Sequence, residues 1–497
     1  MGSEFPLTLG TPEQFATLRA FLDRAGFDER SLCAVFDVEH LYYLFHGFGL
    51  SSRLTHGVDS NGEIACLVRY FLAGEALPAV ELHRWIPEPV HHAMRALGLV
   101  QTLGGDPSRS YCPVILHPFE TVYLASDRRI SPEGVEYGAP DIVMLALSGI
   151  TQSFAAMVPR TPCERFLDLG TGSGAMGLLA AGFAKEVWAT DITERAVAYA
   201  EFNRRLNGAS NVTVVRGDLF APLQGVMFDR IATDPPFEPP VKPNLIYSVG
   251  GEDGEAIIRR LLESLHLALA PGGRLYGICL GTDRENDPVE ARLRRYLGPH
   301  AEEFDLALLI RQEQDPRSYA LEATAMEGAG AEKLERWADF FLGLRAQSVV
   351  YAHFLVQRRS APRPVFTVRR KFGPQSGVAQ AEWLLDWMTR SMTRETDGFI
   401  LEGKPALAPH AELIARHGMQ GGELVPRSYT LNVKHPFEAQ LQCPSWMARM
   451  ASQCDGRRTG RELAEMFHQA SGARSLEGLA ALAAGGFVTL SGHEPPP

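Results

Sequence analysis

Residues Arg165 to Gly177 read RFLDLGTGSGAMG, and this stretch decides the fold of the middle of the chain. A short apolar run, Phe166 to Leu169, leads into a turn that contains Gly170, Gly172 and Gly174. The stretch from Ala175 to Ala181 follows and is rich in helix-forming residues. Strand, tight turn and helix in this order open a nucleotide-binding βαβ unit. The glycines let the backbone approach a ligand, and the start of the helix offers free N–H groups.

The glycine turn alone is compatible with two cofactors. Gly172 to Gly177 also fits G-x-G-x-x-G, so NAD must be considered beside S-adenosylmethionine. The next predicted strand, Glu186 to Ala189, leads to Asp191, which can accept hydrogen bonds from both ribose hydroxyls of either cofactor. A third strand, Val212 to Arg216, precedes Asp218 and Leu219, where a carboxylate can receive an adenine amino group and an apolar side chain can lie against the ring.

The fourth predicted strand separates the two possibilities. Asp229 to Thr233 is followed by Asp234-Pro235-Pro236-Phe237, for which a nicotinamide enzyme has no evident use. With this motif the sequence resembles the class I S-adenosylmethionine-dependent methyltransferases. Within that class it resembles the small-domain enzymes with N/D-P-P-F/Y, among them release-factor glutamine methyltransferases and several base-amine methyltransferases. The resemblance covers roughly residues 135 to 285, including Ser248 to Gly254 and Pro271 to Arg274.

The resemblance implies S-adenosylmethionine as the cofactor, S-adenosylhomocysteine as its product, and an α/β fold with a seven-stranded, doubly wound, Rossmann-like sheet. It assigns cofactor binding to Asp168, Gly170, Thr171, Gly172, Gly174, Asp191, Ile192, Asp218, Leu219 and Asp234. Asp168 is expected near the methionine part of the cofactor. Two further strands, Asp305 to Ile310 and Val349 to Val356, would complete the count of seven.

The catalytic residues are expected in the tetrapeptide Asp234, Pro235, Pro236 and Phe237. Asp234 can accept one N–H of a planar amine and the Pro235 carbonyl the other, which makes the nitrogen more nucleophilic. The two prolines fix the backbone, and Phe237 offers a face for stacking. Asp234 replaces the asparagine usual in glutamine methyltransferases. This departure weakens the assignment to release-factor glutamine and leaves a general-base role open.

Composition limits the remaining possibilities. The 497 residues are 45% apolar and 22% charged, as in ordinary globular proteins with two to four domains. We find no apolar run long enough for a membrane span and no secretory signal, and residues 1–5 resemble a cloning remnant. Seven cysteines without C-x-x-C favour a reducing cytoplasm and predict no metal site. The only histidine doublet, His91-His92, is interpreted as a pair of surface residues.

The charge pattern disfavours nucleic acid as a partner. The net charge is −11, and Arg369-Arg370-Lys371 is the only tight basic cluster, interpreted as a solvated strand end. We therefore expect an N-methyltransferase that acts on a planar or amide-type nitrogen of a protein, peptide or polar small molecule. An RNA or DNA base amine is the alternative acceptor. A catalytically idle cofactor-binding protein is the alternative from another class.

Three domains are expected. Residues 6–127 should form a winged-helix-like accessory domain, in which Thr11 and Gln14 make a capping box and strands 111–116 and 121–124 pair around residues 117–119. Residues 128–360 should form the methyltransferase domain. Residues 361–497 should form a second accessory domain. Its final order of helix, D-G-x-x-T turn, two helices and G-F-V-x-L is similar to winged-helix peptide-binding modules.

Overall fold

A computed structural model describes residues 5–45, 62–137, 140–223, 225–238, 246, 250–326, 330–373, 375–392 and 396–490. The chain divides into two compact units, Met1–Ile278 and Cys279–Pro497. This division differs from the expected domain boundaries at residues 127 and 360, which stay predictions.

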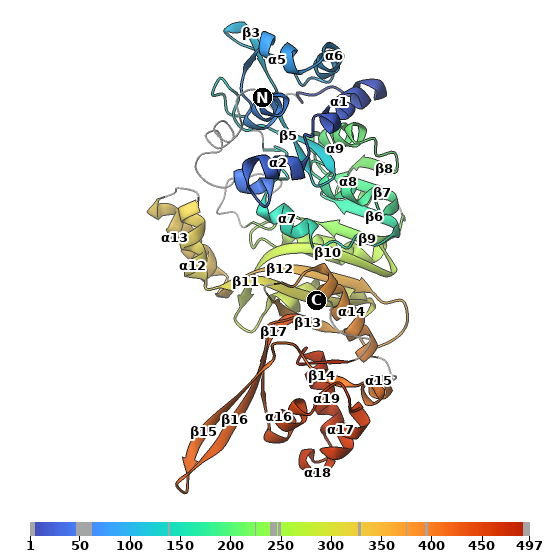
Figure 1. The fold of residues 1–497 in the computed structure, drawn as a ribbon, viewed down its shortest axis with the longest axis vertical. Helices are drawn as coiled ribbons and strands as arrows, with labels where there is room; N and C mark the ends of the chain where they lie inside the picture. The colour runs from blue at the N-terminus through green and yellow to red at the C-terminus, as the bar shows by residue number, and fades with distance from the viewer. Residues whose placement is uncertain are drawn as a thin grey trace. The chain divides into compact units, whose positions relative to one another are not determined.

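The first unit contains an all-parallel sheet (Figure 1). Its strands lie in the order β10-β9-β6-β7-β8. Their bounds are β6 (Cys163–Leu169), β7 (Ala184–Asp191), β8 (Val212–Arg216), β9 (Phe228–Thr233) and β10 (Leu269–Arg284), of which β10 extends past the end of the unit. The helices α8 (Ala175–Ala180), α9 (Glu194–Leu206) and α10 (Ala256–Ser264) lie between successive strands in the sequence. The predicted alternation of strand and helix, and with it the α/β class, is confirmed.

The register of the sheet brings the ends of four strands together. Leu169 lies opposite Thr190 on one side and Thr233 on the other, and Asp191 lies opposite Arg216. Because parallel strands end at the same edge, the residues that follow β6, β7, β8 and β9 share one rim of the sheet. In doubly wound sheets this carboxyl edge is where ligands bind.

The N-terminal part of the first unit is mainly helical. The α1 helix (Pro12–Arg24) begins with the predicted capping box of Thr11 and Gln14. The other elements are α2 (Glu29–Phe36), η1 (Leu41–Leu44), α4 (Glu63–Leu67), η2 (Val68–Ala73), β1 (Leu77–Pro78), α5 (Ala79–Trp85), α6 (Glu88–Ala96), β2 (Gln101–Leu103), β3 (Asp106–Tyr111), β4 (Val114–Phe119), β5 (Val122–Asp127) and α7 (Gly149–Ala155). The predicted hairpin exists as β4 and β5, but its turn was placed wrongly. Residues 117–119 belong to β4, and the chain reverses at Glu120, which has a positive φ of 51°.

The edge of β5 is bound to α9 by two asparagines. The amide of Asn203 accepts from the Ala125 N–H at 2.8 Å and donates to the Ala125 carbonyl at 3.0 Å. Asn207, four residues later, forms the same pair of bonds with Tyr123, at 2.9 and 2.7 Å. Four residues of helix and two residues of strand both advance about 6–7 Å, so the two spacings match. The asparagine side chains thus pair with β5 as a neighbouring strand would.

The second unit begins its sheet with the two predicted late strands. The strands β11 (Phe304–Gln314) and β12 (Ala346–Arg358) pair antiparallel, and β11 also pairs in parallel with β13 (Thr367–Phe372). Further pairing joins β13 to β17 (Phe437–Cys443), β17 to β16 (Glu423–Val433), and β16 to β15 (Glu412–Gln420). The ladder from β11 to β13 therefore crosses the expected boundary at residue 360. A seven-strand count for the catalytic domain stays a prediction.

The remaining elements of the second unit include the predicted C-terminal helices. They are α11 (Val289–Tyr296), η5 (Gly298–Glu303), α12 (Pro316–Met326), α13 (Ala331–Gly343), α14 (Val378–Ser391), α15 (Thr396–Glu402), β14 (Pro405–Leu407), α16 (Ser445–Ser452), α17 (Gly460–Met466), α18 (His468–Ser471), α19 (Ser475–Ala484) and β18 (Val488–Leu490). Thr459 caps α17 with Glu462, and a core that includes Trp446, Leu463 and Leu482 joins these helices. A winged-helix architecture at either end of the chain stays a prediction.

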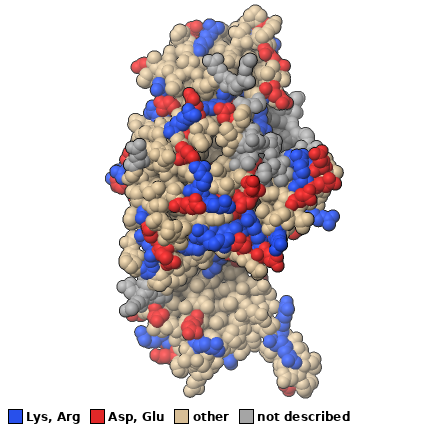
Figure 2. Space-filling view, turned by 180° about the vertical axis from the view of Figure 1, so that it is seen from behind, with Lys and Arg blue, Asp and Glu red and all other residues tan. Residues whose placement is uncertain are grey.

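The basic cluster at residues 369–371 lies at the end of β13, where Lys371 is exposed but Arg369 and Arg370 are not, so the interpretation as a solvated strand end was wrong for the two arginines. Arg369 is half-buried and forms ion pairs with Asp283, Glu290 and Glu313. Lys371 pairs with Glu438. On the face shown in Figure 2, Lys and Arg side chains lie beside Asp and Glu. Within the described part of the chain, no helix has the length and apolar character needed to cross a membrane.

Candidate functional site

The glycine turn forms an open platform at the end of β6. Gly170, Gly172 and Gly174 all have positive φ, at 75°, 55° and 90°. The N–H groups of Gly170 and Thr171 both donate to the Thr190 carbonyl at 2.9 Å, which fixes the turn to the end of β7. A Cβ at Gly170 or Gly172 would meet no atom of the described residues within 4 Å. The backbone of the turn therefore faces open space, so a ligand can lie directly against it.

Asp191 is held by the same turn. Its carboxylate accepts from the Gly172 N–H at 3.0 Å, and from the N–H and the hydroxyl of Thr193 at 2.9 and 3.1 Å. A carboxylate has about four lone-pair sites, so at least one acceptor position remains for a ribose hydroxyl. Ile192, the next residue, is exposed with 52% of its surface accessible. At the end of β7, the predicted ribose ligand Asp191 is thus followed directly by an exposed apolar side chain, that of Ile192.

Asp168 is a buried carboxyl group with an unusual pKa. Its Oδ2 accepts from the Thr171 hydroxyl at 2.5 Å and from the Gly177 N–H at 2.8 Å. Burial raises the pKa of Asp168 to about 6 despite these two hydrogen bonds, and the charge of Asp191 raises it further. A cation bound next to Asp168 would favour the ionised form. The positively charged methionine part of S-adenosylmethionine is such a cation.

Asp218 and Leu219 lie at the end of β8, as predicted, but Asp218 already has a partner. The guanidinium of Arg260, in α10, donates to Asp218 Oδ2 at 2.6 Å. Leu219 adopts a positive φ of 48°. An adenine amino group would therefore share the Asp218 carboxylate with Arg260. No motif around Arg260 predicts that its side chain lies at this position.

Asp234 follows β9 and is partly buried. Burial raises its pKa to about 7, and the negative charges of Asp168 and Glu238 raise it further. The negative charge of Asp168, at the carboxyl end of β6, thus acts on Asp234, which follows β9. These two strands are also joined there by the Thr233 hydroxyl, which donates to the Leu169 carbonyl at 3.0 Å. Such a carboxyl group changes its protonation state near neutral pH, as a general base must.

A second glycine-rich turn holds the backbone after Asp234. The Gly250 N–H donates to the Glu238 carbonyl at 2.8 Å, and the Gly250 carbonyl accepts from the Ala256 N–H at 2.7 Å. A Cβ at Gly250 would lie 2.8 Å from the Pro236 carbonyl oxygen, so only glycine fits. The Pro235 carbonyl has no hydrogen-bond partner among the described residues. It thus keeps its acceptor capacity for a ligand.

Phe237 differs from the stacking surface that the sequence suggests. Its side chain is buried, with 8% of its surface exposed. The residues between 239 and 249, except Ile246, lie outside the described part of the chain. A stacking role for Phe237 therefore stays a prediction.

Asn203 is a site-supporting residue that sequence reasoning missed. It is fully buried, and its amide nitrogen donates to the Ser173 carbonyl at 2.8 Å as well as to Ala125. Ser173 lies inside the glycine turn, so Asn203 connects this turn to the edge of β5. The i, i+4 spacing of Asn203 and Asn207 on an amphipathic helix was the available signal.

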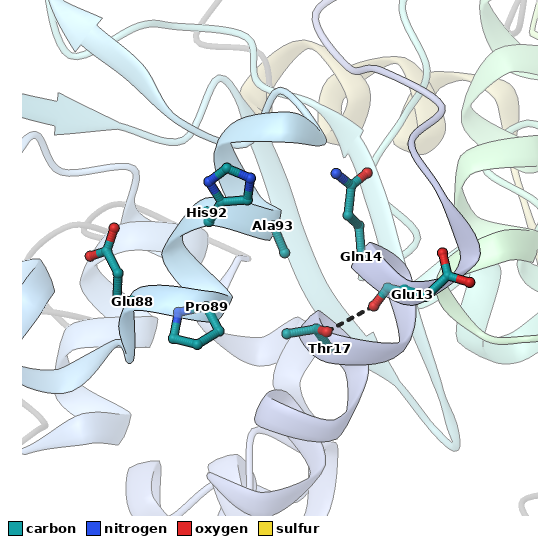
Figure 3. Close-up of a pocket in the computed structure, with 7 residues that line it drawn as sticks. All are labelled: Glu13, Gln14, Thr17, Glu88, Pro89, His92 and Ala93. Atoms are coloured by element: carbon teal, nitrogen blue, oxygen red, sulfur yellow. Dashed lines mark hydrogen bonds between the residues drawn. The ribbon is translucent and has the colours of Figure 1, made fainter.

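The predicted site residues cluster at one edge of the sheet, and a separate pocket lies elsewhere in the first unit. That pocket is formed by α1 and α6 (Figure 3). Its lining residues are Glu13, Gln14, Thr17, Glu88, Pro89, His92 and Ala93. It includes none of the predicted catalytic or cofactor-binding residues.

Sequence comparison identifies the domain that carries the site. Residues 149–281 match the family model described as the methyltransferase small domain. The release factor glutamine methyltransferase of Moorella thermoacetica is 38% identical over 138 residues, which are 25% of this chain and 48% of that protein. The ribosomal protein uL3 glutamine methyltransferase of Bradyrhizobium diazoefficiens is 40% identical over 140 residues, which are 25% and 43%. The release factor glutamine methyltransferase of Deinococcus radiodurans is 36% identical over 183 residues, which are 31% and 63%.

The chain spans between 43% and 63% of the length of these three relatives. Among solved structures, a methyltransferase of Pyrococcus furiosus is 20% identical, with a TM-score of 0.28, and covers 48% of this chain and 90% of its own. The ribosomal protein L11 methylase of Lactobacillus delbrueckii subsp. bulgaricus is also 20% identical, with a TM-score of 0.25, and covers 43% and 81%.

Proposed function

We propose that this chain, whose residues 149–281 form a class I S-adenosylmethionine-dependent methyltransferase domain, methylates an amide-type or other planar nitrogen of a protein or peptide. The observation that carries this proposal is the position of Asp234. It follows β9, faces the charge of Asp168, and has a pKa raised to about 7. The glutamine methyltransferases among the relatives support a protein acceptor.

The residues at the edge of the sheet fit the cofactor. The open space at Gly170 and Gly172 admits a ligand against the backbone, and Asp191 keeps an acceptor position beside it. Asp168 offers a buried negative charge to the cationic end of the ligand. When bound, S-adenosylmethionine supplies a methyl group that its positive sulfur has already activated. The protein must mainly bring an acceptor nitrogen into line with that methyl group.

Asp234 and the Pro235 carbonyl are proposed to orient the acceptor nitrogen. Each can accept one N–H, which localises the nitrogen lone pair and favours attack. Because these bonds strengthen as the nitrogen becomes nucleophilic, they lower the barrier rather than only improve binding. Asp234 can also take the proton that the nitrogen loses after methylation, since its pKa lies near neutral pH. Pro236 and Gly250 hold the backbone that presents both acceptors.

An RNA or DNA base amine is the second candidate acceptor. Aspartate in place of asparagine at residue 234 favours it, because base-amine methyltransferases share this motif. The ion-paired state of Arg369 and Lys371 favours the protein acceptor instead, since it reduces the charge available to phosphates. A catalytically idle protein is less well supported, because the tetrapeptide from Asp234 to Phe237 is intact.

Methyl-labelled cofactor and an extract of the source cells test this proposal. We expect the label in a fraction that protease destroys and nuclease leaves intact, and mass spectrometry should locate it on a side-chain amide nitrogen. Label in nuclease-sensitive material would replace the first candidate by the second. Cofactor binding without any transfer to the extract would favour the idle protein.

A further inference from the structure

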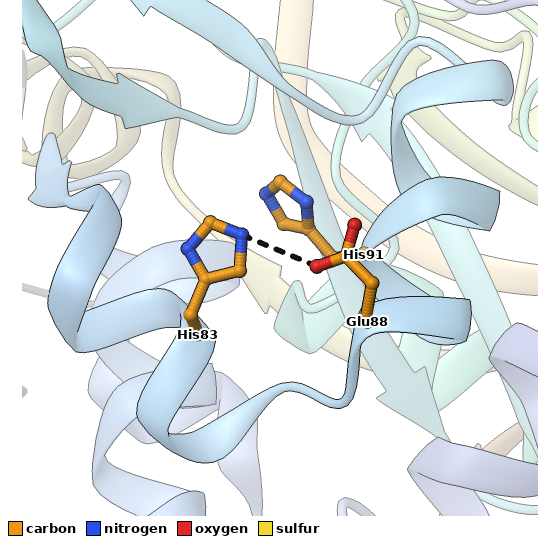
Figure 4. A group of neighbouring side chains, drawn as sticks. All are labelled: His83, Glu88 and His91. Carbon is orange, nitrogen blue, oxygen red and sulfur yellow. Dashed lines mark ion pairs between the residues drawn. The ribbon is translucent and has the colours of Figure 1, made fainter.

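Three side chains with metal-binding atoms meet where α5 and α6 adjoin. His83 lies near the end of α5, and Glu88 and His91 lie one turn apart on α6. One ligand atom from each residue lies within 4.8 Å of the other two. In Figure 4 the Glu88 carboxylate lies close to both imidazole rings. The spacing Glu-x-x-His places both α6 residues on one helix face, and His83 joins them from the neighbouring helix.

His83 is already oriented as a metal ligand would be. Its Nδ1 lies 2.7 Å from the Ala79 carbonyl oxygen, and a carbonyl only accepts, so Nδ1 carries a proton. In the neutral ring the lone pair then belongs to Nε2, which lies 3.4 Å from Glu88 Oε2. Metal-binding histidines commonly donate their other N–H to a backbone carbonyl in this manner.

His91 is the second nitrogen ligand, and its burial is unexpected for a surface histidine. Only 4% of its surface is exposed, whereas the neighbouring His92 is exposed. The interpretation of the doublet as a surface pair was therefore wrong for His91. The centroid of its ring lies 4.6 Å from that of His83, and the ring nitrogens have no hydrogen-bond partner among the described residues.

We propose that His83, Glu88 and His91 bind one divalent transition-metal ion, of which Zn²⁺ is the appropriate probe. Two imidazole nitrogens and one carboxylate oxygen suit Zn²⁺. Tetrahedral coordination separates such ligand atoms by about 3.4 Å, so they must approach each other slightly. The exposed side chains of His83 and Glu88, at 45% and 75%, have the freedom to do so. The ion would join α5 to α6, and water would complete its coordination.

Zinc binding by the full-length chain tests the proposal. Tag-free protein, stripped with a chelator, is titrated with Zn²⁺ by calorimetry and by thermal unfolding. We expect one ion per chain at this site and a melting temperature that rises with zinc concentration. Removal of a group that only hydrogen-bonds to a metal ligand lowers metal affinity about 10- to 100-fold. His83 and Glu88 are proposed as direct ligands, so His83→Ala and Glu88→Gln should each weaken zinc binding at least tenfold.

The matched control is His92→Ala, because His92 is adjacent to His91 and lies outside the cluster. It should retain the affinity of the wild type. His83→Ala and Glu88→Gln alter exposed side chains, so both variants should fold even if replacement of the buried His91 does not. The proposal is overturned if the wild type takes up no zinc, or if both variants bind zinc as the wild type does.

Discussion

Ionisation of the buried carboxyl groups of Asp234 and Asp168 lowers the stability of the folded protein. Burial is the main cause that raises their pKa values, to about 7 and about 6, from an ordinary value of 3.8. A carboxyl group whose pKa is raised on folding contributes stability below its unfolded pKa, and this contribution is lost as the pH rises through the folded pKa. Between pH 4 and pH 7 the charge of Asp234 therefore becomes progressively more destabilising.

Replacement of Asp234 by asparagine should reveal this cost. At pH 8.5 we expect Asp234→Asn to be about 1–2 kcal/mol more stable than the wild type, after allowance for solvent screening. This corresponds to a rise of roughly 2–8 °C in melting temperature. At pH 4 the difference should largely disappear, because the carboxyl group is then protonated in the folded state and close to half-protonated in the unfolded state, where its pKa has the ordinary value of 3.8. Thermal unfolding at both pH values measures the effect, and Asp218→Asn, at an exposed ion pair, is the control.

Asp191 provides a separate prediction for the cofactor. Asp191→Ala should weaken binding of S-adenosylmethionine or S-adenosylhomocysteine by about 1–3 kcal/mol, because a ribose hydroxyl loses its acceptor. Calorimetry measures the affinity. Glu194→Ala, an exposed residue at the start of α9, should bind as the wild type does. If NAD binds more tightly than S-adenosylmethionine and S-adenosylhomocysteine, the carboxyl edge of the sheet is not an S-adenosylmethionine site.

At the scale of elements, α9 links the glycine turn to the N-terminal hairpin. Asn203 bonds both Ala125 and Ser173, whereas Asn207 bonds Tyr123 and lies away from the turn. Either alanine variant leaves buried backbone groups of β5 without partners, at about 1–3 kcal/mol for each group. Both Asn203→Ala and Asn207→Ala should therefore melt at lower temperature.

Only one of these two variants should also lower the affinity for the cofactor. Asn203→Ala releases the Ser173 carbonyl inside the glycine turn, so it should weaken cofactor binding by about tenfold, the effect of one lost hydrogen bond. Asn207→Ala should retain wild-type affinity when measured below its melting temperature. Equal affinities of the two variants would show that β5 does not influence the turn through Asn203.

The elements near the cofactor motif could be predicted from sequence because local signals are strong there. Apolar strands that end at or next to Asp168, Asp191 and Asp234 alternate with helices, and the register then places these ends at one edge. The pairing of Asp218 with Arg260 could not be predicted, because it joins residues 42 positions apart through tertiary packing. The hairpin β15–β16 was missed although Gly421-Gly422 between apolar stretches is a recognised turn signal.

At the scale of the whole molecule, the expected boundary at residue 360 can be tested against the ladder between β11 and β13. A chain of residues 1–360 lacks β13 and leaves the β11 edge unpaired, which favours aggregation. A chain of residues 1–373 retains that ladder. We expect the longer fragment to yield more soluble, monomeric protein in gel filtration. If residues 1–360 are equally soluble and monomeric, the C-terminal region is an independent module, as the sequence suggested.

The role of Asp234 in methyl transfer is tested by comparing wild type, Asp234→Asn and Asp234→Ala on the labelled fraction of the extract, with cofactor affinity measured for each. We predict that Asp234→Ala binds the cofactor but transfers methyl groups on the order of 30- to 1000-fold more slowly, a loss of roughly 2–4 kcal/mol in the transition state. Asp234→Asn should keep intermediate activity if Asp234 only orients the nitrogen, and should equal alanine if Asp234 is a general base. Unchanged turnover of Asp234→Ala would show that the carboxylate has no part in activating the acceptor nitrogen, and the proposed role of Asp234 would be wrong.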